Sequence, residues 1–444
     1  MTGKDFDGPV LSAKPGFHYR DLFLEKVLPV VDGKVSLAIP SAKLGVIGEF
    51  PGEPPAEAAQ IAPPTTQAVA AAATATQAAA DKVKDISEVD TNFKTEKFEG
   101  ETLEFRNVLT DSVFEITGFP WRQPGEPFHR LPLENGFSKT LNNLSRHTSG
   151  GMVRFTTNAR RIAVRTKWIM AWEGNTQPRT GKFGIDFYLM AGTGKDSFFR
   201  NIAGGRAEMN GTPLQAWVFR PPITSDKGNF ITWTMYLPTY CGEEILELGF
   251  EPGAEFKPCP PQKIAKPIVF YGSSITQGGC ASRPGNKYTT MLCRVLDAPE
   301  VNLGFSGSAK GEEEMARLIA TLDMSAFVLD YDYNSPNAEH LAETHARFFN
   351  IVREAQPNLP IVILSRCTLY TNDRTAVIRK TYEDAIAKGD KKVWFVEGST
   401  LIDQEAKIAA SVDGCHPNDL GFYLMYKNLL PVFADIFQRQ DLLK

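Results

Sequence analysis

The sequence predicts an α/β domain with a parallel sheet, preceded by an antiparallel β-sandwich. Two observations support this fold class. From residue 261 onward, short and continuously apolar runs alternate with amphipathic helical patterns, as expected of a parallel sheet covered by helices on both faces. From about residue 96 to 260, short runs rich in β-branched and aromatic residues are separated by Gly, Pro, Asn and Asp, which is typical of a sandwich. We therefore expect a three-layer, flavodoxin-like α/β domain after a jelly-roll-like sandwich.

The chain has 444 residues, which at roughly 150 residues per domain suggests two or three domains. We divide it into residues 1–95, 96–260 and 261–444. The first part contains the proline-rich "GEFPGEPPAEAAQIAPPTT" and then the alanine-rich "QAVAAAATATQAAADKVKD". Because proline favours extended chain and alanine favours helix, we interpret this part as an N-terminal arm with a linker or a single helix. A partner-binding or oligomerising helix is the alternative.

The strand-like runs of the middle part, in chain order, are "GGMVRFTTNARRIAVRTKWIM", "GKFGIDFYLMAG", "LQAWVFRPP", "NFITWTMYLP" and "EILELGFEPG". In the last part the expected strands are "PIVFYG", "EVNLGF", "AFVLDYD", "PIVILSR" and "KVWFVEG". The helical patterns between and after them are "NKYTTMLCRVL", "GEEEMARLIATL", "AEHLAETHARFFNIVREA", "TAVIRKTYEDAIAKG" and "GFYLMYKNLLPVFADIF". In the third of these, Leu341, Phe348, Phe349 and Val352 share one helical face.

Composition excludes several classes of partner. Apolar residues make up 42% and charged residues 23%, and the net charge of -4 gives no basic surface for nucleic acid or anionic lipid. The longest bland run, "AVAAAATA", is far shorter than the ~20 apolar residues of a spanning helix. No signal peptide is visible at the N-terminus. We expect a cytoplasmic protein without nucleic-acid or membrane partners; a secreted or periplasmic protein is the alternative if a leader has been removed.

Cysteines and histidines give no sign of a metal site. The cysteines are sparse and form no C-x-x-C pair, so we interpret them as buried or incidental thiols; they are Cys241, Cys259, Cys280, Cys293, Cys367 and Cys415. No H-E-x-x-H or comparable ligand cluster occurs among the six histidines. We therefore expect no metal and no cofactor.

The residues that follow the strands carry the chemical information, because ligands of an open parallel sheet bind at the carboxyl ends of its strands. The first strand is followed by Ser274, the second by Gly307, and the third by Asn334 and Asn337; "VDGCHPND", before the last helix, supplies Asp413 and His416. A serine, a histidine and amide donors on one edge suit acyl transfer, in which serine attacks, histidine takes its proton and the amides hold the oxyanion.

Competing motifs do not fit this edge. "GSSITQGG" lacks the Lys and the glycine spacing of a phosphate-binding P-loop, and no G-x-G-x-x-G occurs. The nucleophile elbow G-x-S-x-G fails because Thr276 stands two residues after Ser274.

Residues 261–444 resemble the SGNH (GDSL-type) hydrolase superfamily. "GSSITQG" is similar to its first block, G-D-S, with Ser273 in place of Asp, and "FSGS" is similar to its glycine block. "DYDYN" stands where G-x-N-D is expected, with Asp332 in place of Gly and Ser335 in place of Asp. "DGCH" is similar to the final D-x-x-H. The four blocks follow one another in the family's order.

The resemblance implies a role for each matching residue. Ser274 would be the nucleophile, His416 the base, and Asp413 the carboxylate that orients it. The backbone amides of Ser274 and Gly307 and the side chain of Asn334 would form the oxyanion hole. Asn337 is the alternative to Asn334, which matches the G-x-N spacing.

The middle part resembles the sandwich domain that precedes this hydrolase domain in some bacterial carbohydrate esterases and lipase-like proteins, because "GIDFY" is similar to its G-x-D-L-Y signature. Members of this branch often remove acetyl groups from polysaccharides. We therefore expect a serine esterase that forms an acyl-enzyme and removes short acyl groups, with O-acetyl groups on a carbohydrate as the expected substrate. The alternatives are a short-chain lipase or arylesterase with the same triad, and a carbohydrate-binding protein without activity.

Other residues have ordinary interpretations beside functional ones. Arg283 in "CASRPG" is a candidate contact for an anionic sugar, although surface arginines are common. Cys280 and Cys415 flank the nucleophile and the base, and inert thiols are favoured over a disulfide between them. His340 and His345 lie on a predicted helix as solvated or core-edge residues, and Asp186 and Tyr188 of "GIDFY" are expected to be structural. The partner is a small-molecule, oligosaccharide or polysaccharide ester, and the sequence does not indicate an oligomeric state.

Overall fold

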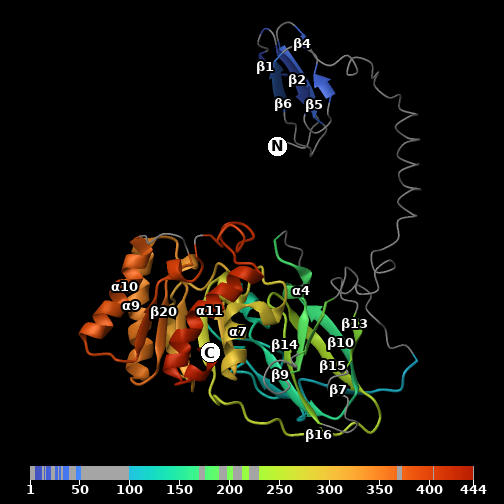
Figure 1. Cartoon of the computed structure of the whole chain (residues 1–444), viewed down its shortest axis with the longest axis vertical. Coiled ribbons are helices and arrows are strands. Elements are labelled where there is room, and N and C mark those ends of the chain that lie inside the picture. The colour runs from blue at the N-terminus through green and yellow to red at the C-terminus, as the bar shows by residue number, and fades with distance from the viewer. Residues whose placement is uncertain are drawn as a thin grey trace. The chain divides into compact units, whose positions relative to one another are not determined.

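Figure 1 shows the computed structural model of the chain, which forms two compact units, Met1–Lys94 and Thr95–Lys444. In the first unit it describes the strands between residues 6 and 51. In the second it describes residues 100–169, 176–189, 198–203, 213–219, 230–367, 373–403 and 405–443.

The described part of the first unit is built of short strands in two antiparallel three-stranded sheets, ordered β1-β5-β4 and β3-β2-β6. Their bounds are β1 (Phe6–Ser12), β2 (Phe17–Asp21), β3 (Lys26–Leu28), β4 (Val30–Val31), β5 (Lys34–Ile39) and β6 (Ile47–Pro51). These strands are not among the elements predicted above. The alanine-rich segment predicted as linker or helix lies outside the described residues, and the division at residues 95 and 260 stays a prediction.

The second unit begins with a β-sandwich, as predicted. One antiparallel sheet has the order β13-β10-β15-β7, and the other has the order β12-β11-β14-β9-β16, with β8 also paired to β9. The bounds are β7 (Glu104–Asn107), β8 (Glu115–Thr117), β9 (Met152–Thr157), β10 (Arg161–Ile169), β11 (Ile185–Leu189), β12 (Phe198–Ile202), β13 (Leu214–Phe219), β14 (Ile231–Tyr236), β15 (Gly242–Phe250) and β16 (Phe256–Lys257).

Alternation along the strands explains how the two sheets pack. On β10, Ile162, Val164 and Trp168 are buried in the core between the sheets, whereas Arg165 and Lys167 between them are only partly covered. A period of two places one set of side chains on each face of a strand, so the apolar set faces the opposite sheet. The same core contains Phe155, Phe187 and Trp233 and many further aromatic and aliphatic side chains.

The α/β domain has a five-stranded parallel sheet with the order β18-β17-β19-β20-β21. Its strands are β17 (Ile268–Gly272), β18 (Glu300–Gly304), β19 (Ala326–Asp330), β20 (Ile361–Leu364) and β21 (Val393–Val396). Each lies within one of the five apolar runs predicted as strands. This strand order is that of flavodoxin-like folds, so the predicted fold class is confirmed.

Helices cover both faces of this sheet. One face packs against α8 (Glu313–Ala320), α9 (Ala338–Ala355) and α10 (Asp373–Ala387), and the other against α7 (Tyr288–Leu296) and α11 (Asp419–Ile436). Figure 1 shows α9 and α10 on one side of β20 and α11 and α7 on the other. The sheet is therefore the middle of three layers, which is why its strands are apolar on both faces.

One arginine joins the segment between β8 and β9 to the edge of the parallel sheet. Arg130 is fully buried and donates hydrogen bonds to the carbonyls of Asn302 (2.9 Å) and Gly304 (2.7 Å) on β18. It also donates to the carbonyls of Leu144 and His147, each at 2.7 Å. A planar guanidinium suits this task because it carries five N–H donors in a fixed fork.

We predict that Arg130→Met lowers stability strongly. The variant leaves three buried carbonyls and one partly buried carbonyl without their donor, and an unpaired buried polar group costs about 1–3 kcal/mol. The free energy of unfolding, measured by urea denaturation, should fall by about 3 kcal/mol or more. Arg317→Met is the control, because the Arg317 side chain is 66% exposed and its loss should change stability by less than about 0.5 kcal/mol. An Arg130→Met protein as stable as the control would contradict the assigned role.

Candidate active site

Ser274 is the first residue of α6 (Ser274–Gln277), a single turn that begins directly after β17. The Ser273 hydroxyl accepts a hydrogen bond from the backbone N–H of Ile275 and so caps the turn. The N–H of Ser274 lies in the first turn of a helix, where a backbone donor has no intrahelical acceptor. The local sequence thus places a hydroxyl and a backbone amide together at the edge of the sheet.

Two glycines allow α6 to pack directly on the strand ends. A Cβ on Gly272 would lie 2.0 Å from the Thr276 hydroxyl, and a Cβ on Gly304 would lie 2.3 Å from the backbone nitrogen of Gln277. Any larger residue at either position would push the turn, and Ser274 with it, away from the sheet. The "YGSS" and "LGFS" sequences therefore contain glycine for reasons of space.

The structure brings together the three residues predicted as a triad. Ser274 Oγ lies 2.9 Å from His416 Nε2, although the two residues are far apart in sequence. His416 Nδ1 lies 2.7 Å from Asp413 Oδ2, and the backbone N–H of His416 donates to Asp413 Oδ1 at 2.7 Å. With Nδ1 protonated toward the carboxylate, the neutral imidazole leaves Nε2 free to accept the proton of the Ser274 hydroxyl.

Hydrogen bonding keeps Asp413 ionised. Its partial burial by itself would raise the pKa of the carboxyl group, but the bonds from the His416 backbone and imidazole and from the Cys415 N–H outweigh burial and lower the pKa to about 2. Asp413 therefore carries a negative charge throughout the neutral range. A fixed charge at this position favours the protonated imidazole that forms when His416 takes a proton.

The loop after β18 and the turn after β19 meet beside Ser274's strand. Gly307 has a positive φ of 66° and its N–H donates to Asn334 Oδ1 at 3.1 Å. The Nδ2 amide of Asn334 donates to the carbonyl of Phe305 at 2.9 Å, which uses one of its two hydrogens. The two predicted oxyanion donors are thus in direct contact, and the Gly307 N–H already has a partner inside the protein.

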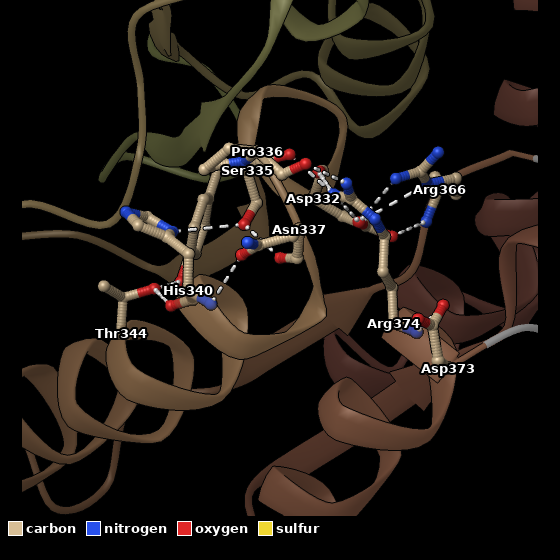
Figure 2. A network of polar contacts seen from close by, with 10 residues as sticks. Asp332, Ser335, Pro336, Asn337, His340, Thr344, Arg366, Asp373 and Arg374 are labelled. Carbon is tan, nitrogen blue, oxygen red and sulfur yellow. Dashed lines mark hydrogen bonds and ion pairs between the residues drawn. The ribbon is translucent and has the colours of Figure 1, made fainter.

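Asn337, the alternative to Asn334, has a different environment. Its side chain accepts a hydrogen bond from the His340 N–H at 2.9 Å and caps the N-terminus of α9 (Figure 2). His340 in turn lies 3.1 Å from the Ser335 hydroxyl. The contacts of Asn334 lead to the Gly307 loop, whereas those of Asn337 lead to its own helix.

Gln277 is a site residue that the sequence analysis missed. It is fully buried; its Nε2 donates to the Thr239 carbonyl (3.0 Å) and lies 3.0 Å from His147 Nδ1, while its Oε1 accepts from the Ser306 N–H (3.0 Å). Burial, and then the charge of Arg130, lower the pKa of His147 to about 3, so its ring is neutral and can accept this bond. Gln277 thereby ties the Gly307 loop to the sandwich.

Asp330, at the end of β19, is a second residue missed. Its Oδ2 accepts hydrogen bonds from the hydroxyls of Tyr288 (2.7 Å) and Thr276 (2.8 Å). Burial raises the pKa of this carboxyl group to about 7, despite these two donors. Asp330 thus binds α6 through Thr276. In the sequence, its place at the end of an apolar strand is the signal that could have identified it as a residue of the site.

Arg283 contacts the sandwich rather than an open surface. It forms an ion pair with the buried Asp186 at 3.1 Å and donates to the Tyr188 hydroxyl, and Asp186 also accepts from the Gly285 N–H at 2.8 Å. Asp186 and Tyr188 belong to "GIDFY", so this signature connects the two domains. These contacts give no support to the predicted role of Arg283 in binding substrate, which stays a prediction.

The remaining candidates behave as structural residues. All six cysteines are free thiols; Cys280 is buried and Cys415 is exposed. His345 is buried against the Thr381 hydroxyl at 2.9 Å, and burial lowers the pKa of its ring to about 3. Within the described ranges, no group of three or more His, Cys, Asp or Glu residues could hold a metal ion. Among the helices that the structure describes, none is long and apolar enough to span a membrane.

An open cavity of about 600 Å³ adjoins the His416 loop. Val412, which lines it, donates its backbone N–H to the carbonyl of His416 at 2.9 Å. Gln177 reaches the cavity from the sandwich, and its buried Oε1 has no hydrogen-bond partner among the described residues. The full lining is Thr176, Gln177, Pro178, Cys280, Ser282, Val412, Asn418, Asp419 and Leu420.

Comparison with known proteins agrees with this architecture. Residues 265–434 match the family model of the GDSL-like lipase/acylhydrolase family, and residues 103–256 match the GxDLY model, described as the N-terminus of an SGNH-hydrolase-type esterase. No curated protein matches the sequence.

Solved structures share the two-domain fold. A Bacteroides ovatus protein described as a GDSL-like lipase has 27% identity and a TM-score of 0.65, covering 76% of this chain and 98% of its own. The salicylyl-acyltransferase SsfX3 of a tetracycline biosynthetic pathway has 18% identity and a TM-score of 0.63, covering 76% and 98%. A family two carbohydrate esterase from Cellvibrio japonicus has 12% identity and a TM-score of 0.50, covering 77% and 99%.

The two family models match neighbouring segments in the order in which the sandwich and the α/β domain occur, and the solved structures share that arrangement. The chain therefore belongs to the SGNH (GDSL-type) hydrolases, in the branch whose hydrolase domain follows a GxDLY sandwich domain.

Proposed function

We propose that this hydrolase is a serine esterase that removes short acyl groups, above all acetyl, from carbohydrate hydroxyls. The observation that carries the proposal is the unbroken chain of hydrogen bonds from Ser274 through His416 to Asp413, at the carboxyl edge of the parallel sheet. A hydroxyl, an imidazole and an ionised carboxylate in this order form the arrangement that activates serine for acyl transfer.

The proposed reaction has two halves. Ser274 Oγ attacks the ester carbonyl while His416 Nε2 takes its proton, and the resulting tetrahedral intermediate breaks the bond to the alcohol, which leaves with the proton from His416. A water molecule then attacks the acyl-enzyme, again giving its proton to His416, and Ser274 is released with the free acid. Asp413 orients the imidazole and stabilises its charged form without being protonated itself.

The proposed oxyanion hole combines backbone and side-chain donors. Two donors are available to a substrate oxygen. One is the Ser274 N–H, which lies at the start of α6, and the other is the second Nδ2 hydrogen of Asn334, since the first is bonded to the Phe305 carbonyl. The Gly307 N–H would join them when its bond to Asn334 Oδ1 opens or is shared. Such donors stabilise the charge that develops on the carbonyl oxygen only as the transition state forms.

The surroundings of the site favour a small acyl group and a polar alcohol. The segments after the strands, "GGCASRPGNK", "SGSAKGEE" and "YNSPN", are polar in sequence, which favours a short acyl group over a long apolar one. The cavity beside the His416 loop is lined in part by polar side chains, among them Thr176, Gln177 and Asn418, and such side chains can form hydrogen bonds to the hydroxyl groups of an alcohol. Carbohydrate esterases occur on this fold, as the Cellvibrio japonicus enzyme illustrates, and a sugar supplies such hydroxyl groups.

We predict that Ser274→Ala and His416→Ala abolish hydrolysis of p-nitrophenyl acetate. The first variant removes the attacking oxygen and the second removes the base that activates it, so turnover should fall by ~10⁴-fold or more. Release of p-nitrophenol measures the rate, and circular dichroism and urea unfolding report whether each variant is folded. Substantial turnover by folded Ser274→Ala would remove Ser274 from the mechanism. Cys415→Ser, a change of an exposed thiol beside the base, is the matched control and should stay active.

We predict that acetyl esters are hydrolysed with a higher kcat/KM than octanoyl esters. Each buried methylene would contribute ~0.8 kcal/mol to binding a long chain, but only where an apolar trough receives it. A series of p-nitrophenyl esters from acetyl to octanoyl tests this, and acetate release from acetylated xylan and mannan tests the carbohydrate. A kcat/KM that rises toward octanoate would favour the lipase alternative.

We predict that Asn334→Ala lowers kcat by ~10²–10³-fold and leaves KM almost unchanged, because a lost oxyanion donor acts only in the transition state. Asn337→Ala is the matched control, since it removes a helix cap and should affect stability by about 1 kcal/mol rather than kcat. Steady-state kinetics of the two variants decide between them. The opposite result, a silent Asn334→Ala beside a strongly impaired Asn337→Ala, would assign the donor to Asn337.

A further inference from the structure

The guanidinium group of one arginine forms hydrogen bonds to the turn that contains Asn334. Arg374, near the N-terminus of α10, donates its Nη1 to the carbonyls of Ser335 (2.6 Å) and Asp332 (3.1 Å) and its Nη2 to the carbonyl of Pro336 (2.9 Å). These acceptors lie on both sides of Asn334 in the chain. Figure 2 shows Arg374 reaching this turn from a helix that follows the next strand of the sheet.

A carboxylate strengthens the same contact. Asp332 is almost fully buried; its Oδ2 accepts from the Arg366 N–H at 3.0 Å, and its Oδ1 lies 3.4 Å from Arg366 Nη2 and 3.6 Å from Arg374 Nη1. Two arginines thus face one buried carboxylate across the turn (Figure 2). The turn is held to the end of β20 through Arg366 and to α10 through Arg374.

These residues stand where the chain departs from the family's third block. Asp332 replaces the usual Gly and Ser335 replaces the usual Asp of G-x-N-D. Asp332 has no positive φ, so its backbone does not require glycine, and its side chain makes the bonds to the arginines. The Ser335 hydroxyl donates to the Asn337 carbonyl at 3.0 Å, within the same segment. Among the described residues, the side chain of Asn334 itself forms hydrogen bonds to the Gly307 loop, from the Gly307 N–H and to the Phe305 carbonyl.

We propose that Arg374 is a positioning residue for the oxyanion hole: its three bonds to backbone carbonyls fix the Asn334 turn so that Asn334 Nδ2 points at the developing oxyanion. The proposal rests on the proposed function, because it needs Asn334 to be a donor. It predicts that Arg374 acts on the transition state through Asn334 and through no other group. A displacement of about 1 Å in such a group can lower the rate by ~10²-fold.

The experiment is a double-variant cycle on kcat for p-nitrophenyl acetate. Arg374→Met should lower kcat by ~10–100-fold with KM changed less than about twofold, because ground-state binding does not use the oxyanion donor. In the Asn334→Ala background, Arg374→Met should lower kcat no further, because the group that it positions is already absent. Arg374→Lys should recover part of the loss, since an ammonium group can reach one or two of the carbonyls but not all three in one plane.

Arg353→Met is the matched control. Arg353 also donates to backbone carbonyls, those of Leu359 (2.6 Å) and Lys392 (2.9 Å), but it does so beside the amino end of β20, at the opposite end of the sheet from the site. It should lower the free energy of unfolding in urea and leave kcat unchanged. Both Arg374→Met and Arg353→Met should then lower the free energy of unfolding, but only Arg374→Met should lower kcat.

Three results would overturn the proposal. They are an unchanged kcat in Arg374→Met, a loss of kcat in the Asn334→Ala background as large as in the wild-type background, or an equal loss in Arg353→Met. If Arg374→Met does not fold, the same cycle is run with Arg374→Lys and judged by the same criteria. Failure of the proposed function is seen separately: active Ser274→Ala removes the serine mechanism, and silent Asn334→Ala removes the donor, and neither variant alters Arg374.

Discussion

The parallel pairing of β17 with both of its neighbours is the constraint on which the site depends. The register places Gly272 opposite Gly304 on β18 and opposite Asp330 on β19, so the three strands end at the same level. The residues that follow them, with Ser274 at their centre, therefore meet although they come from distant parts of the chain. Because Gly272 and Gly304 lack a Cβ, α6 packs directly against the strand ends, and its first residue, Ser274, lies close to the edge of the sheet. A shift of one residue in either pairing would separate Ser274 from the loops beside it.

The sandwich supports this edge through buried polar contacts. Arg130 donates a hydrogen bond to the Asn302 carbonyl of β18, and the Gln277 amide contacts His147 and the Thr239 carbonyl. Asp186 accepts a hydrogen bond from the N–H of Gly285, in the loop that follows α6. Buried polar groups of this kind are stabilising only when their partners are complete, and removing one partner leaves the other unpaired. The sandwich is therefore part of the framework of the site, which gives a physical reason for the two domains to occur together. It also means that variants of sandwich residues can alter the hydrolase domain.

Sequence reasoning recovered what depends on local pattern. Continuous apolar runs marked all five parallel strands. The rule that sites lie at strand ends singled out Ser274, and the segment before the last helix supplied His416; the structure brings these two residues within hydrogen-bond distance. It missed contacts that depend on distant partners: Arg130 contacts β18 more than 170 residues later, and no spacing in the sequence signals such a pair. The ion pair of Arg283 was missed for the same reason, since its partner Asp186 lies in the sandwich. The strands of residues 6–51 were missed because they are short, although β5, "KVSLAI", alternates apolar Val35, Leu37 and Ile39 with other residues.

We propose that Ser274 is a nucleophile activated by His416, and covalent labelling of the Ser274 hydroxyl is the most direct test of this role. The protein is incubated with a fluorophosphonate, which reacts with activated serines, and the adduct is located by mass spectrometry of the intact chain and of its peptides. We expect one phosphonyl group per chain, on the peptide that contains Ser274, and a much slower reaction in His416→Ala. Labelling at another residue, or an esterase that hydrolyses p-nitrophenyl acetate at full rate while Ser274 stays unlabelled, would contradict it.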